Sequence, residues 1–270
     1  MAKYKKKRAR ELQHDRFRDT AMTLMDRLGD KLEGKGKAIL YGIGAVILMV
    51  AVAGLYLRWS HKKQDEALRA LGRGITIATA PISPAASTDP ANPTFASERE
   101  RAQRAAEEFQ KVVAKYGDPY RTKARYLAAT NQLLFDRNQA ISELTELARS
   151  GNTEVATLAK FALAQAKEND GSFDEAAQLY RDLAAQNSVI VTSESANLRL
   201  ALVYDKQGKK REAADILFNM VDAARKAKDE EGAPRSESAA VREAVKVLQK
   251  IDPGRHAQLA PTAPLSDLSF

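Results

Sequence analysis

The feature that most constrains this chain is an apolar run of twenty residues, from Ala38 to Leu57, that contains no charged side chain. A helix of twenty residues is about 30 Å long, which matches the hydrocarbon core of a bilayer. Basic residues flank the run, and Tyr41, Tyr56 and Trp59 lie near its ends, where amphipathic rings favour the membrane interface. The sequence therefore predicts a single transmembrane helix.

A cleaved signal peptide and a buried core helix are the two alternatives. A signal peptide has a short basic lead and a small-residue cleavage site beyond its apolar stretch. Here thirty-seven residues precede the run, and its Ala-x-Ala pattern, Ala51 to Ala53, lies inside it. A wholly apolar core helix is rare in a chain in which 29% of the residues are charged. A retained anchor is the favoured interpretation.

The charge of the N-terminal segment predicts the orientation of the anchor. Residues 1–37 contain twelve Lys or Arg and six Asp or Glu, and positively charged segments stay on the cytoplasmic side. Apolar residues at helical spacing between Phe17 and Leu32 predict an amphipathic helix in this tail. That helix is expected to lie on anionic headgroups or to dock on a membrane partner, and no nucleic acid is expected. The larger part of the chain is then expected on the outer side of the membrane.

The chain beyond the anchor divides into three segments. Residues 58–96 are expected to form a membrane-proximal helix, which could continue the anchor, followed by a proline-rich linker. Residues 97–250 have helical periodicity almost throughout. Residues 251–270 are predicted to be a disordered tail. The fold class predicted is all-α.

A repeat search gives the architecture of the helical segment. The stretch from Gly171 to Gln186 resembles the turn and second helix of a tetratricopeptide repeat (TPR), with Gly-x-aromatic-x-x-Ala and an aromatic residue four positions later. Alanines recur in the same register at intervals of 35 to 37 residues, near the TPR period of roughly 34. They are Ala105, Ala140, Ala176 and Ala213 in the second helices, with Ala128, Ala164 and Ala201 in the first helices. Small residues let two antiparallel helices approach closely, so a TPR-like α-solenoid is predicted.

The layout of the whole chain resembles the bacterial membrane-anchored TPR proteins of the YfgM-like group. A basic start with RARELQHDRF, one membrane helix, LGRGITIATAPISP and degenerate TPR units carry this resemblance. It implies an inner-membrane protein with a periplasmic repeat domain, whose partners are translocon subunits, a periplasmic chaperone or client chains. A longer basic tail and the proline-rich insert depart from the group. Two alternatives stay open: an envelope-assembly or cell-division scaffold of the Tol-Pal-associated kind, and an anchor for a cytoplasmic regulator.

Solenoids of this kind bind partners on the concave surface that their first helices line. Positions five, nine and twelve of each first helix are therefore the candidate peptide-binding residues: Arg125, Ala129 and Gln132; Phe161, Gln165 and Glu168; Leu198, Leu202 and Asp205. Their mixed apolar and polar character suits an extended or amphipathic hydrophobic segment. The alternative is that a C-terminal helix at 238–250 covers the apolar members of this set.

No pattern in the sequence points to catalysis. The three histidines, His14, His61 and His256, lie in separate segments, and there is no cysteine. No glycine-rich phosphate loop follows a strand. Adjacent acidic residues occur on helical segments that also carry Lys and Arg, as solvated faces do. The prediction is a non-enzymatic scaffold without catalytic residues, metal or cofactor.

Overall fold

The computed structural model describes residues 36–84, 87, 89, 92–228 and 235–261. Within these residues every regular element is an α-helix, and the extended backbone is limited to the isolated bridges Ile82–Phe95 and Ser87–Thr94. The predicted all-α class is confirmed. The amphipathic helix predicted in the basic tail lies outside the described residues. The chain divides into two compact units, residues 1–64 and 65–270.

Helix α2 (Gly36–Ala78) is continuous over 43 residues and includes the predicted span and the membrane-proximal helix. In the first unit its apolar side chains are exposed, with Leu48 and Leu55 at 66% and 70%. By length and composition, α2 is the one helix in the described part of the chain that could cross a membrane. The exposure argues against a buried core helix, because such a helix would have its apolar surface covered by the protein.

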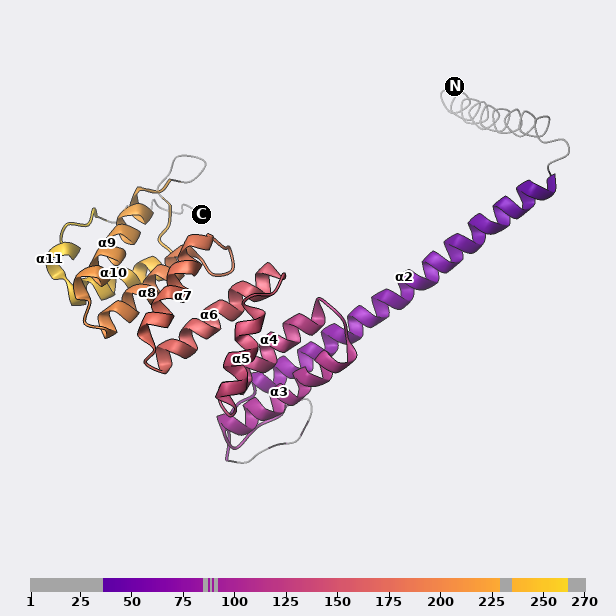
Figure 1. The fold of residues 1–270 in the computed structure, drawn as a ribbon, viewed down its shortest axis with the longest axis horizontal. Coiled ribbons are helices and arrows are strands. Elements are labelled where there is room, and N and C mark those ends of the chain that lie inside the picture. The colour runs from indigo at the N-terminus through magenta and orange to yellow at the C-terminus, as the bar shows by residue number, and fades with distance from the viewer. Residues whose placement is uncertain (1–35, 85–86, 88, 90–91, 229–234, 262–270) are drawn as a thin grey trace, which may run out of the picture. The chain divides into compact units, whose positions relative to one another are not determined.

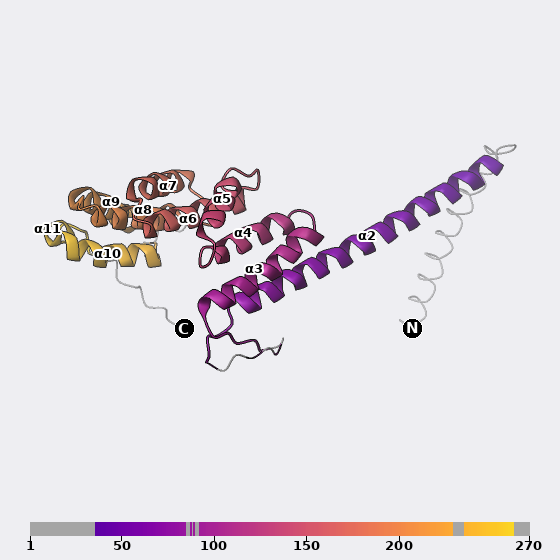
Figure 2. The same cartoon turned by 60° about the horizontal axis from the view of Figure 1, so that its bottom comes forward.

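The second unit is built from successive antiparallel helices, as Figures 1 and 2 show. Each helix packs mainly on its neighbours in the sequence, and α4 also contacts α6, as α8 contacts α10. Contacts between first helices of adjacent units are what stacked helical hairpins require. The helices after α2 are α3 (Glu98–Lys115), α4 (Tyr120–Gln132), α5 (Arg137–Leu147), α6 (Thr153–Asn169), α7 (Phe173–Gln186), α8 (Ser193–Lys206), α9 (Lys210–Lys226), α10 (Ala239–Ile251) and α11 (Pro253–His256).

Side chains at the helix starts explain where many of these helices begin. The oxygen of an N-cap Ser, Thr, Asp or Asn accepts a hydrogen bond from a backbone N–H of the first turn, which has no partner inside the helix. Five helices of the unit, α3, α5, α6, α8 and α10, are capped in this way, by Ser97, Asp136, Asn152, Thr192 and Ser238. The helix boundaries are thus encoded locally.

The alanines of the predicted repeat register are buried. All seven, Ala105, Ala128, Ala140, Ala164, Ala176, Ala201 and Ala213, have an exposed fraction of 1% or less. They belong to apolar clusters between consecutive helices, in which larger residues such as Phe109, Tyr180 and Leu217 fill the adjoining space. The TPR-like register is therefore confirmed by burial as well as by helix order.

The packed repeat unit begins before residue 97. Ala70 and Leu71 of α2 share one apolar cluster with Ala105, Phe109 and Val112 of α3. The end of α2 thus acts as the first helix of the first hairpin, whereas the sequence placed it outside the repeat domain. The reason is its apolar face, which α3 covers.

The C-terminal end of the described chain also differs from expectation. Residues 251–270 were predicted to be disordered, but α11 forms within this range and is capped by the side chain of Asp252. Leu259 packs against the cluster formed by α8, α9 and α10. Residues 262–270 lie outside the described residues, so the prediction stays open for them.

Gly171 and Gly208 end α6 and α8 in a left-handed conformation, with φ of 74° and 77°. A side chain is strained there, although an added Cβ would meet no atom within 4 Å. We expect Gly171→Ala to lower the free energy of unfolding of the repeat unit by about 1 kcal/mol, measured by urea denaturation. The matched control is Gly117→Ala, at a glycine without positive φ, which should leave the stability unchanged or raised. Equal effects of the two substitutions would contradict this account of the turn.

Candidate protein-interaction surface

The nine residues predicted to line a groove are at best partly accessible. Ala129, Gln132 and Glu168 are buried. The other six are half-buried: Arg125, Phe161, Gln165, Leu198, Leu202 and Asp205. Several of them contact neighbouring helices, and these contacts decide what each side chain can still do.

Arg125 of α4 is engaged by the second helix of its own hairpin. Its Nε lies 2.5 Å from Oε1 of Glu143, and its Nη2 lies 3.0 Å from Oε2 of Glu146, both on α5. The hydrogen bond with Glu143 raises the pKa of the Arg125 guanidinium above its ordinary value. Arg125 therefore fastens α4 to α5, and its charge is already balanced.

Glu168 ties three helices together. Tyr180 of α7 donates its hydroxyl to Oε2 of Glu168 at 2.9 Å, and Lys206 of α8 donates Nζ to Oε1 at 2.7 Å. Glu168 is only 6% exposed, and Lys206 belongs to the next repeat unit. Burial, reinforced by the charge of Glu168, raises the pKa of Tyr180 well above its ordinary value, so the hydroxyl stays a neutral donor. This side chain holds adjacent units in register.

We expect Tyr180→Phe to lower the free energy of unfolding by about 1–2 kcal/mol, because a buried hydrogen bond to a carboxylate is lost while the ring is kept. Thermal or urea unfolding of residues 60–270 measures this. Tyr204→Phe is the matched control, since the Tyr204 hydroxyl accepts an exposed hydrogen bond from Arg181. A control that loses as much as Tyr180→Phe would show that the buried carboxylate has no special role.

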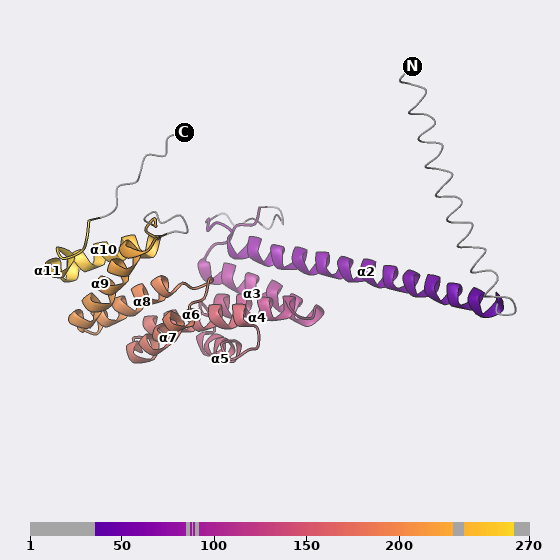
Figure 3. The same cartoon turned by 90° about the horizontal axis from the view of Figure 1, so that it is seen from above.

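The apolar members of the predicted set contribute to the core. Phe161 packs edge-on against Tyr180, with ring centroids 5.9 Å apart. Leu198 packs against the cluster that contains Val241 and Leu248 of α10, and Figure 3 shows α10 beside α8 and α9. At Leu198, the alternative that a C-terminal helix covers the predicted groove is therefore the one the contacts support.

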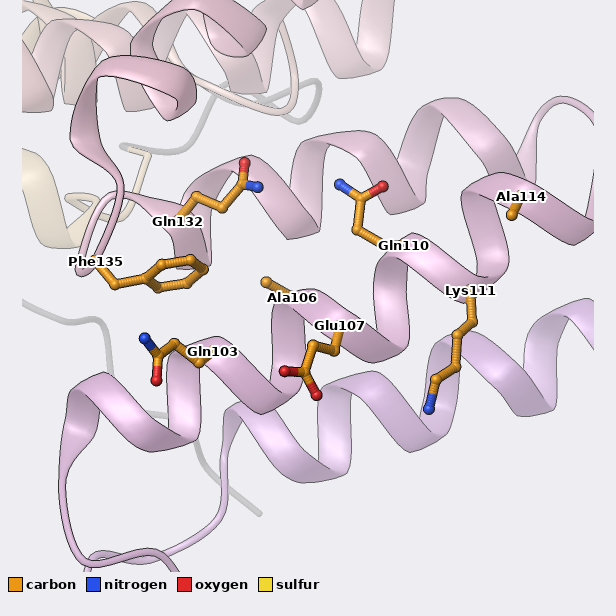
Figure 4. Close-up of a pocket in the computed structure, with 8 residues that line it drawn as sticks. All are labelled: Gln103, Ala106, Glu107, Gln110, Lys111, Ala114, Gln132 and Phe135. Atoms are coloured by element: carbon orange, nitrogen blue, oxygen red, sulfur yellow. The ribbon is translucent and has the colours of Figure 1, made fainter.

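A hollow of about 790 Å³ lies between α3 and the end of α4 (Figure 4). It is lined by Gln103, Ala106, Glu107, Gln110, Lys111, Ala114, Gln132 and Phe135. Of these, Gln132 alone belongs to the predicted set. The search missed the rest because it considered only first helices, although Gln103, Ala106, Gln110 and Ala114 recur at helical spacing on α3.

A second hollow, of about 480 Å³, is lined by the end of α2, the proline-rich segment and α3. Arg73, Ile77, Pro93, Phe95 and Arg104 are among its lining residues. The predicted linker thus folds back to form a wall of this hollow. Among the described residues, no group of three or more His, Cys, Asp or Glu side chains is placed to hold a metal ion.

Comparison with known proteins adds little to this description. No family model matches the chain, and no curated protein is similar to it. A crystal structure of nearly identical TPR-like repeats, described as from a kinesin light chain of Podosopora anserina, has a TM-score of 0.46 and 19% identity. A single-substitution variant of that protein has a TM-score of 0.45 and 19% identity. Both matches cover 60% of this chain and 82% of the other.

Proposed function

We propose that this chain is a non-enzymatic, membrane-anchored TPR-like scaffold that holds a protein-binding helical repeat close to a bilayer. The observation that carries the proposal is the continuity of α2. This single helix supplies an exposed apolar run of membrane-spanning length and, through Ala70 and Leu71, part of the repeat core. A rigid connection of this kind suits a scaffold, because it fixes the height of the repeat above the membrane.

In the finer form of the proposal, the membrane is the bacterial inner membrane, the N-terminus is cytoplasmic and the repeat unit is periplasmic. The excess of basic residues in 1–37 supports this orientation. The partners are translocon subunits, a periplasmic chaperone or client chains. Scaffolding of envelope assembly or cell division, and anchoring of a cytoplasmic regulator by the basic tail, are the alternative functions.

The orientation predicts the behaviour of reporter fusions. A reporter that is active only after export should be active when fused after Phe270, because the basic tail keeps the N-terminus inside. A fluorescent protein that matures only in the cytoplasm should be dark at the same position. The opposite pair of results would reverse the orientation and, with it, the choice of partners.

The scaffold function is tested by purifying the full-length protein in a mild detergent and identifying associated proteins by mass spectrometry. Residues 1–64 alone are the control, because they retain the anchor and lack the repeat unit. Translocon or chaperone subunits retained by the full chain alone would support protein export, whereas peptidoglycan-linked proteins would favour envelope assembly. Deleting residues 2–33 separates out the third function, since a cytoplasmic regulator would be lost by this deletion.

A further inference from the structure

We infer that the hollow between α3 and the end of α4 binds an uncharged, extended polypeptide segment, which the carboxamide of Gln132 recognises through its backbone. The inference rests on the proposed function and names the binding site within it. The site differs from the groove expected from the sequence, since α3, a second helix, provides most of its lining.

Gln132 is the residue that points to a ligand. It is the last residue of α4 and only 8% exposed, and its side chain has no hydrogen-bond partner among the described residues. Its backbone carbonyl, by contrast, accepts from Phe135 N at 3.0 Å and Asp136 N at 2.7 Å, which fixes the turn after α4. A buried polar side chain is normally hydrogen-bonded. An amide that is held in place, nearly buried and open only to a hollow is therefore available to a partner.

The lining around Gln132 is suited to a peptide backbone. A carboxamide has two N–H donors and an oxygen acceptor, the same groups that a peptide unit offers in complementary form. Gln103 and Gln110 add two exposed carboxamides to the same hollow. Figure 4 shows them with Ala106 between them along α3, and Phe135 beside Gln132. The small alanine allows a backbone to approach the helix, and the ring of Phe135 offers an apolar surface to one side chain.

The charges of the hollow favour an uncharged ligand. Its lining contains one acid, Glu107, and one base, Lys111. Glu107 is paired with Arg104 at 3.1 Å, and Lys111 is paired with Glu108. Each charge is thus balanced by a neighbour on α3 itself. A charged ligand would have to break these pairs or enter without a counter-ion, which disfavours it.

The length of the lining sets the size of the segment. Gln103 and Ala114 mark its ends on α3, which are about 16 Å apart along the helix axis. An extended chain rises about 3.3 Å per residue, so roughly five residues fit along the hollow. A volume of about 790 Å³ accommodates a short segment with small or apolar side chains.

The test uses the full-length protein in detergent and a phage-displayed library of random seven-residue peptides. The binders selected on the wild-type protein are synthesised with blocked ends and a fluorophore, and their affinities are measured by fluorescence polarisation. We expect mostly uncharged peptides to be selected. Gln132→Met, which keeps the shape of the side chain and removes its amide, should weaken them about tenfold without lowering the melting temperature.

Two further variants keep the result interpretable. Ala114→Arg places a bulky charge at an exposed end of the hollow and should abolish binding while the fold is kept. Gln165→Met, at a half-buried glutamine of α6 outside the hollow, should bind like the wild type. Selection of charged peptides, failure to select any, or equal affinity for wild type and Gln132→Met would each overturn the inference. Retention of partners in copurification would show in those cases that the scaffold function itself still stands.

Discussion

Replacing Phe109 with alanine is expected to lower the free energy of unfolding of the repeat unit by about 3–5 kcal/mol, the usual range for emptying a buried aromatic site. Phe109 is fully buried in the cluster that joins α2 to α3 and α4. An added Cβ on Gly74 of α2 would lie 2.4 Å from its ring, which shows how closely the helix and the ring approach. Loss of the ring removes the main contact that keeps the end of α2 in the repeat.

Chemical denaturation of residues 60–270 measures this effect. Gly74→Ala provides the coupled control. It should destabilise the wild-type unit because the ring must shift, and it should be tolerated in the Phe109→Ala background, where the space is vacant. If the effects of the two substitutions simply add, or if Phe109→Ala costs less than about 1 kcal/mol, the end of α2 is not part of the first hairpin.

Replacing Ala176 with leucine is expected to lower the free energy of unfolding by about 1–3 kcal/mol, because the added methyl groups overpack a closed helix contact. Ala176 has no exposed surface and lies in the cluster shared by α6, α7 and α8. Displacing α7 would also strain the hydrogen bond between Tyr180 and Glu168, which links this unit to the next one.

The melting temperature of residues 60–270 is the readout for this variant. Ala185→Leu is the matched control on the same helix, where the alanine is exposed and leucine is a good helix former. It should leave the melting temperature nearly unchanged. An Ala176→Leu variant as stable as the wild type would undo the repeat register, and Ala213→Leu in the next unit should then be tested for the same reason.

Much of the architecture followed from short-range patterns. A run without charges indicates a membrane-spanning helix because the bilayer fixes its length and excludes charge. The alanine register at 35 to 37 residues predicted the hairpin contacts, since close helix approach admits only small side chains at the crossing point. Gly171 and Gly208 marked two of the turns because a left-handed backbone favours glycine. Each of these signals depends on a residue and its immediate neighbours along one helix or turn.

The tertiary structure decided how side chains from different helices are used. Glu168 was expected in an open groove, but the hydroxyl of Tyr180 and the ammonium of Lys206 converge on it from α7 and α8. Gln132 occupies the same repeat position and finds no such partner among the described residues, so it remains available at the hollow beside α3. The sequence by itself determined the helices, their register and the anchor, because these depend on local spacing and polarity. The tertiary structure alone separated a structural tie from an open amide, because that difference depends on which distant side chains reach the same point in space.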